Sequence, residues 1–220
     1  QSAGWVSACA QTAPAISSIL FIAPMPTIQK IVATKSVGDL PLLPYSSMVA
    51  NAFLWTMYGL LKSESKIILP NAFGFCMGLY YSLQFSRSCS KHASNLPGTV
   101  SQHKTGASLI IAFAVLVTAC LGRQNAVKVI GKLGVVVCIV LFASPLAALK
   151  TVIQTKSAES IPLPFTLVCL LNCFLWSVAG LFEMKDFYVY FPNLLGFASA
   201  AVQLFLRIFY GSGANSALPF

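Results

Sequence analysis

Long uncharged stretches alternate with short charged connections along this chain. Seven stretches contain no Lys, Arg, Asp or Glu, and they cover residues 1–29, 40–61, 67–86, 105–122, 133–149, 160–182 and 187–206. Each has about 17 residues or more, the length that an α-helix needs to cross a hydrocarbon core about 30 Å thick. Barrel strands would need only about ten residues of alternating polarity. The pattern therefore predicts an all-α membrane protein with seven transmembrane helices.

Composition supports this class. Hydrophobic residues make up 57% of the 220 residues and charged residues only 9%, whereas soluble domains have roughly 25% charged residues. The net charge of +9 comes from basic residues scattered among the connections, which argues against a nucleic-acid partner. Most of the seven cysteines fall inside the stretches, so we interpret them as packing residues and not as a disulfide scaffold. Residues 1–29 lack the basic start of a secretory signal, and we interpret them as the first span.

The sequence contains an internal duplication. A shift of 121 positions places residues 24–60 on 145–181 and aligns "NAFLWTMYGL" with "NCFLWSVAGL". After one added residue the match continues from "LPNAFGF" (69–75) to "FPNLLGF" (191–197). Spans one to three and five to seven are therefore two copies of one three-helix unit. Since three crossings end on the opposite side of a membrane, we interpret 105–122 as a linker helix that lets both copies share one orientation.

The duplication sets the expected domain organisation. We expect a first repeat, a polar loop with the linker helix, a second repeat and a short tail, at residues 1–86, 87–128, 129–210 and 211–220. With the N-terminus outside, the inner segments carry eight basic residues and the outer segments six. The positive-inside rule then favours an outside N-terminus and a cytoplasmic C-terminus.

Two asparagines lie near the middle of predicted spans, each one helical turn before a tryptophan. They are Asn51 before Trp55 and Asn172 before Trp176. A polar residue at that depth is costly, and it either lines a functional site or bonds across helices. Its repetition favours the functional site. Residues i and i+4 share a helix face. An amide that can hydrogen-bond the hydroxyls of a sugar therefore lies beside an indole that can pack on the C–H face of the sugar ring.

A second pair of asparagines, Asn71 and Asn193, follows a proline in the third and seventh spans. A proline frees a backbone carbonyl one turn earlier. These asparagines could belong to a helix-start motif, with proline in the first turn. Their identity in both copies favours the binding pocket.

Four prolines break the chain at the same membrane face. Pro24 and Pro145 close the first helix of each repeat, and Pro41 and Pro162 open the second. The arrangement is typical of a gate or hinge, although proline is also common at the ends of helices that have no such role.

The seven stretches contain no Asp, Glu, Lys, Arg or His. Proton-driven carriers use such groups as relays, so we predict facilitated diffusion without energy coupling. His92 and His103 lie in the polar connection, where we expect them to be solvated, and no metal-ligand set surrounds them. We predict neither an enzyme nor a cofactor or metal.

The segments "PMPTIQKI", "TKSVGDLP", "ANAFLWTMYGL" and "LPNAFGF" and their counterparts resemble the SWEET sugar transporters of the MtN3/saliva group. The resemblance implies two parallel three-helix bundles joined by an inversion linker helix, alternating access and a homo-oligomer. It assigns hydroxyl contacts to Asn71 and Asn193, stacking walls to Trp55 and Trp176, and size limits to Asn51 and Asn172. It also places Met25 and Leu146 where the family tunes sugar size, and Pro24, Pro41, Pro145 and Pro162 in its proline tetrad.

The resemblance also implies a size preference, since many members of that family that carry disaccharides have a smaller residue where this chain has Asn51 and Asn172. We therefore expect the substrate to be a monosaccharide such as glucose, with a disaccharide as the other possibility, crossing the plasma membrane or an internal membrane. One alternative is a PQ-loop carrier for amino acids or cystine, which should show a Pro-Gln pair and an intramembrane acid. The other is a seven-helix receptor, for which an internal duplication is not expected.

Overall fold

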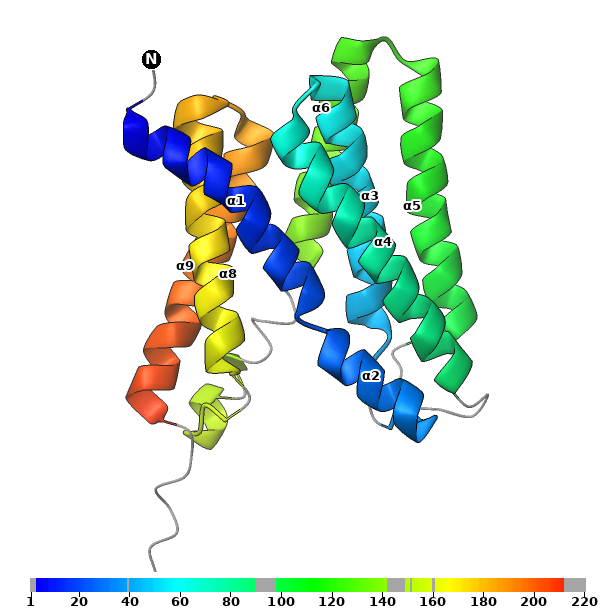
Figure 1. The fold of residues 1–220 in the computed structure, drawn as a ribbon, viewed down its shortest axis with the longest axis vertical. Helices are drawn as coiled ribbons and strands as arrows, with labels where there is room; N and C mark the ends of the chain where they lie inside the picture. The colour runs from blue at the N-terminus through cyan, green and yellow to red at the C-terminus, as the bar shows by residue number, and fades with distance from the viewer. Residues whose placement is uncertain are drawn as a thin grey trace, which may run out of the picture. The chain divides into compact units, whose positions relative to one another are not determined.

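The computed structural model describes residues 3–38, 40–89, 98–141, 149–150, 152–159 and 161–211 (Figure 1). Over these residues the regular secondary structure is helical, which confirms the predicted fold class. The named elements are α1 (Gly4–Ile22), α2 (Met25–Thr34), α3 (Leu43–Lys62), α4 (Ser65–Ser88), α5 (Val100–Cys120), α6 (Arg123–Leu141), α8 (Leu163–Val178), the π-helical turn η1 (Ala179–Glu183) and α9 (Phe187–Tyr210).

These helices overlap the seven uncharged stretches. Among the described residues, five segments are long and apolar enough to cross a membrane: α1 with α2, α5, α6, α8 with η1, and α9. Helices α3 and α4 have 20 and 24 residues, which is also enough to cross. The helix ends differ from the expectation, since α5 begins at Val100 and α6 at Arg123, both before their uncharged stretches. Basic side chains are tolerated at helix ends because they reach the water interface.

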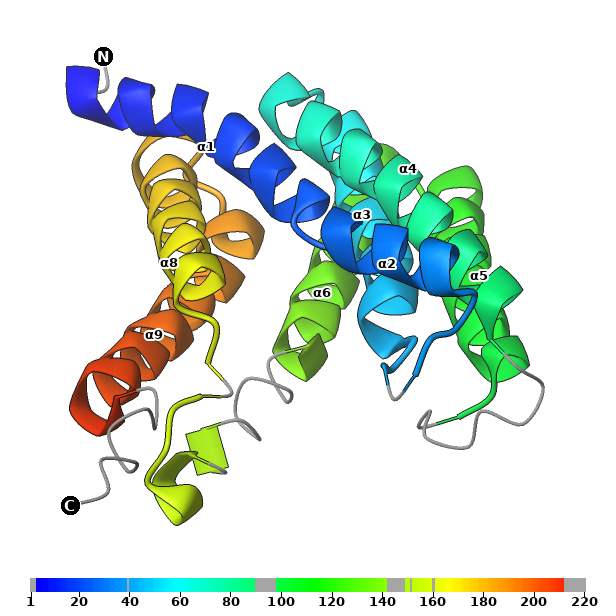
Figure 2. The ribbon, with the colours of Figure 1, turned by 60° about the horizontal axis from the view of Figure 1, so that its bottom comes forward.

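The chain forms two compact units, which we describe separately. One contains residues 17–134, and the other contains residues 1–16 with 135–220. In the first unit, α3 packs against both α4 and α5 (Figure 2). In the second unit, the main helix pair is α8 with α9. The repeat boundaries that we expect from the sequence remain a prediction, because compactness and repetition are different properties.

The two repeats pack their second and third helices with matching side chains. Phe53 of α3 and Phe75 of α4 have ring centroids 5.4 Å apart. Their counterparts, Phe174 of α8 and Phe197 of α9, have ring centroids 6.0 Å apart. Corresponding residues thus make corresponding contacts, and the duplication extends from sequence to structure.

A close backbone approach is also shared by the repeats. A Cβ atom on Gly59 would lie 3.0 Å from the backbone nitrogen of Ile68, and one on Gly180 would lie 2.8 Å from that of Tyr190. Real Cβ atoms rarely approach backbone atoms this closely, so these positions require glycine for packing. The glycines bring the end of one helix against the start of the next in each copy.

The extra residue of the second repeat falls in the connection after its second helix. The offset between the copies is 121 at Gly180 and 122 at Asp186, so the insertion lies between these residues. Lys62 ends α3 and its counterpart Glu183 ends η1, whereas residues 63–64 precede α4 and residues 184–186 precede α9. The second connection is therefore one residue longer. It follows the π-helical turn, where the N–H of Met184 donates to the carbonyl of Ala179 at 2.8 Å, an i to i−5 bond.

Candidate functional site

The first half of the predicted sugar site lies on α3. Asn51 is partly buried and Trp55 is 9% exposed. The indole of Trp55 meets the ring of Tyr58 edge-on, with centroids 5.5 Å apart. It also lies against Gly134 of α6, where an added Cβ would be 3.3 Å from the ring. Neighbours on two helices therefore fix the plane of this indole, which a stacking wall requires.

Asn71 and Asn193 are each held by a bond within their own helix. The side-chain nitrogen of Asn71 donates to the carbonyl of Ile67 at 2.8 Å, and that of Asn193 donates to the carbonyl of Val189 at 2.7 Å. This bond uses one amide proton and leaves the amide oxygen out of the interaction. Each asparagine thus combines a fixed position with a group that can accept from a hydroxyl.

The prolines before these asparagines lie inside helices and not at their starts. Pro70 is the sixth residue of α4, and Pro192 is the sixth of α9. Helix-start prolines occupy the first turn, so the helix-start interpretation is wrong. The helices begin instead at Glu64 and Asp186, whose side chains accept from backbone N–H groups two residues later.

The second half of the predicted site repeats the first on α8 and α9. Asn172 is partly buried, and Trp176 is 7% exposed one turn later. Since α8 packs on α9 as α3 packs on α4, each Asn–Trp pair lies on a helix beside the one that carries the other asparagine. The structure thus brings together half-sites within each unit. Their union into one pocket remains a prediction.

The described prolines of the expected gate lie at helix breaks. Pro24 separates α1 from α2, with φ −71°, and Pro41 lies just before α3. Pro162 caps the start of α8. Met25 begins α2 and packs on the core beneath it. Pro145 and Leu146 lie outside the described residues.

A tyrosine that sequence reasoning missed caps the break at Pro24. Prolines have no N–H, so Pro24 and Pro26 cannot donate to carbonyls at the end of α1. The hydroxyl of Tyr81, from α4, donates to the carbonyl of Phe21 at 2.9 Å and lies 3.5 Å from that of Ile22. Tyr81 is fully buried, and this bond ties the broken end of the first helix to the third span.

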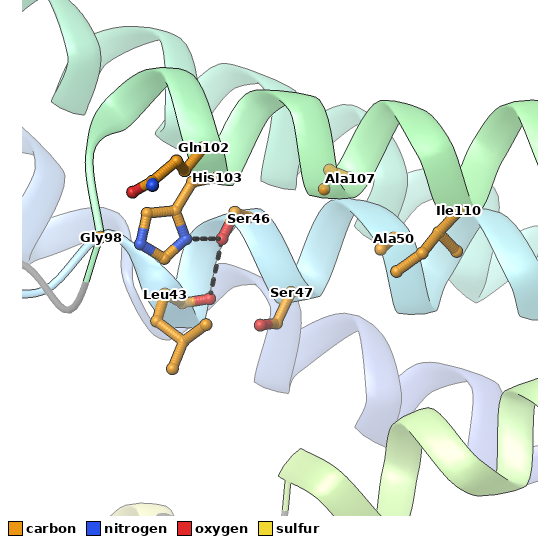
Figure 3. A pocket seen from close by; sticks show the side chains of 10 residues that line it. Leu43, Ser46, Ser47, Ala50, Gly98, Gln102, His103, Ala107 and Ile110 are labelled. Carbon is orange, nitrogen blue, oxygen red and sulfur yellow. Dashed lines mark hydrogen bonds between the residues drawn. The ribbon is translucent and has the colours of Figure 1, made fainter.

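A cavity of about 410 Å³ lies between α3 and α5 (Figure 3). His103 points into it and is partly buried, which corrects our expectation of a solvated side chain. Its Nδ1 lies 3.1 Å from Ser46 Oγ, which itself donates to the carbonyl of Leu43. The histidine tautomer decides whether the ring nitrogen or the hydroxyl donates in this pair. None of the six predicted sugar contacts lines this cavity, although Ser47 lies one turn before Asn51. The sequence signal for this cavity was the pair of adjacent polar residues, Ser46 and Ser47, inside the second predicted span.

Residues 10–93 and 128–214 match the family described as a sugar efflux transporter for intercellular exchange. The chain is similar to bidirectional sugar transporter SWEET14 of Arabidopsis thaliana, with 34% identity over 201 residues that cover 89% of this chain and 69% of the relative. It is also similar to sugar transporter SWEET1 of Dictyostelium discoideum, with 30% identity over 199 residues that cover 89% of each.

A solved structure of a eukaryotic SWEET transporter has a similar fold, with a TM-score of 0.82 over 94% of this chain and 99% of that chain. The identity is 24%, so this likeness supports the fold alone. The two-part match to the family model covers both repeats, and the family is one of transporters and not of enzymes. The chain is a multi-pass integral membrane protein and belongs to the SWEET family of sugar transporters.

Proposed function

We propose that this protein moves a monosaccharide, with glucose as the first candidate, down its gradient across a membrane. The observation that carries this proposal is the repeated Asn–Trp pair on one helix with a second asparagine on the helix packed beside it. The SWEET relatives named as sugar transporters support the same substrate class.

The half-sites suit a sugar because they offer two kinds of contact. The largely buried indoles of Trp55 and Trp176 supply flat apolar surfaces for the C–H face of a pyranose. The amides of Asn71 and Asn193, held by their intrahelical bonds, supply neutral acceptors for hydroxyls. A neutral sugar needs no charged partner. Asn51 and Asn172 add bulk beside the indoles, which favours one ring over two.

Alternating access belongs to the same proposal. The break at Pro24 divides the first span into α1 and α2, and prolines precede α3 and α8. Such breaks let helix segments rotate without loss of interior hydrogen bonds. The uncharged middles of the spans provide no proton relay, so we propose uniport. The outside N-terminus, the cytoplasmic C-terminus and the homo-oligomer are part of this proposal.

The test is counterflow of radiolabelled glucose and sucrose in proteoliposomes that contain the purified chain, with and without a pH gradient. We expect exchange of glucose that exceeds exchange of sucrose and does not depend on the gradient. Trp176→Ala should abolish exchange. Trp5→Ala is the matched control, since Trp5 is 56% exposed on α1 and lies outside the proposed pocket.

Three outcomes would count against the proposal. Accumulation of glucose above the outside concentration under a pH gradient would exclude uniport. Equal activity of Trp176→Ala and Trp5→Ala would exclude the stacking role. Folded protein that exchanges neither sugar but exchanges amino acids would favour the PQ-loop carrier instead.

A further inference from the structure

A second cavity, of about 300 Å³, forms a groove between α4 and α5 with α3 as its floor. Both helices pack on α3 but make few contacts with each other, and residues from all three helices line the groove. Its volume is at the lower end of the range of about 300–1,000 Å³ for small-molecule pockets. The six predicted sugar contacts do not line it, so it is a separate candidate site.

The end of the groove near the start of α5 is polar and basic. Lys104 and His103 line it from the first turns of α5, and Ser86 lines it from the last turn of α4. A capping box formed by Thr99 and Gln102 fixes the start of α5, where the helix dipole favours an anion. No acidic side chain is among the described residues that line the groove. This end is therefore complementary to a negative charge.

A buried hydroxyl lies farther along the groove. Ser82 lines it from α4, and its Oγ is buried with no hydrogen-bond partner among the described residues. A buried polar atom in that state destabilises the fold. The Oγ of Ser82 has almost no accessible surface, so the hydroxyl donates to an ester or glycerol oxygen of a ligand in the groove only after its side chain rotates towards the groove.

The opposite end of the groove is apolar. Leu79 and Leu83 of α4 and Ile111 of α5 line it, and both leucines are almost half exposed. The polarity thus changes along the helix axes from a basic helix end to the hydrocarbon-facing middle of the spans. A soluble anion would leave the apolar end empty, and an apolar helix would leave Lys104 and Ser82 without partners.

We propose that this groove binds one anionic phospholipid. Its phosphate lies at Lys104 and the start of α5, its glycerol region reaches Ser82, and an acyl chain follows Leu79, Leu83 and Ile111. Basic pockets between transmembrane helices bind anionic headgroups by the same attraction. The lipid bridges α4 and α5, so it holds the linker helix to the first repeat.

The test uses the full chain purified in detergent, with native mass spectrometry to count retained lipids and thermal unfolding to measure stabilisation. Phosphatidylglycerol is compared with phosphatidylcholine of the same acyl chains. Lys104→Gln should bind phosphatidylglycerol about fivefold more weakly, the factor expected for one basic residue at a membrane surface. Lys132→Gln removes an exposed lysine from α6 and should bind as the unchanged chain does.

A second variant tests the shape of the groove. Ser108→Phe places a ring in the groove from an exposed position on α5, where it should not disturb folding, as unfolding without added lipid will show. It should lose retention of phosphatidylglycerol. Equal retention of both lipids by the unchanged chain, or equal binding by Lys104→Gln and Lys132→Gln, would overturn the proposal. A thermal shift with glycerol phosphate alone that equals the shift with phosphatidylglycerol would also overturn it. Retention of the lipid by a Ser108→Phe variant whose oligomeric state has changed would do the same.

Discussion

The cap that Tyr81 provides for the first helix can be tested by removing one oxygen atom. Tyr81→Phe keeps the ring and its edge-on contact with Tyr45, whose centroid is 6.0 Å away. It removes the hydroxyl that donates to the carbonyl of Phe21 at 2.9 Å. That carbonyl lies at the end of α1, where Pro24 and Pro26 cannot supply backbone donors.

The expected magnitude follows from burial. Tyr81 is 0% exposed, so water cannot replace the hydroxyl without rearrangement. A buried acceptor that loses its donor costs about 1–3 kcal/mol, and we expect about 1–2 kcal/mol because the second contact, to Ile22, is long. For a chain of this size this corresponds to a fall in Tm of about 2–8 °C.

The assay is thermal unfolding of the purified protein, followed by tryptophan fluorescence, together with glucose counterflow. Tyr80→Phe is the control, because Tyr80 is the next residue of α4 but is 39% exposed. We expect its Tm to stay within about 2 °C, as for most surface substitutions. If Tyr81→Phe and Tyr80→Phe unfold at the same temperature as the unchanged chain, the bond does not stabilise the break and our reasoning is wrong.

Three further predictions follow from the repeats. Gly180→Ala places a Cβ 2.8 Å from the backbone nitrogen of Tyr190 and should lower stability by about 1–3 kcal/mol in thermal unfolding; an unchanged Tm would show that the helices can separate there freely. Asn193→Ala should abolish glucose counterflow, and normal exchange by this variant would remove its amide from the pocket. Asn51→Ser combined with Asn172→Ser should raise sucrose exchange relative to glucose exchange, whereas an unchanged ratio would refute the size argument.

The uncharged stretches predicted the helical spans because the absence of charge is the dominant requirement for a segment in lipid. They could not predict helix ends in the connections. Arg123 begins α6 because its guanidinium stays at the interface, where it donates to the carbonyl of Leu61 and to Ser63 Oγ beyond the end of α3. Such a bond joins residues about 60 positions apart and leaves no local sequence signal.

The candidate site, too, could be predicted from the sequence only in part. The repetition of asparagine and tryptophan identified residues that lie on packed helix pairs, because duplicated side chains occupy equivalent positions. The place of Pro70 inside α4 could not be predicted, since the local sequence does not show that the helix begins at Ser65. His103 was missed because its partner, Ser46, lies 57 residues away.

The connection that follows the π-helical turn at residues 179–183 has a consequence for how a duplicated membrane protein can diverge. One residue added inside an α-helix rotates everything after it by about 100°, which would turn polar side chains toward lipid. Here the added residue lies between the end of η1 and the start of α9, so Gly180 still meets the start of α9 as Gly59 meets the start of α4. The two copies therefore differ in length and in sequence while their packing faces stay in phase.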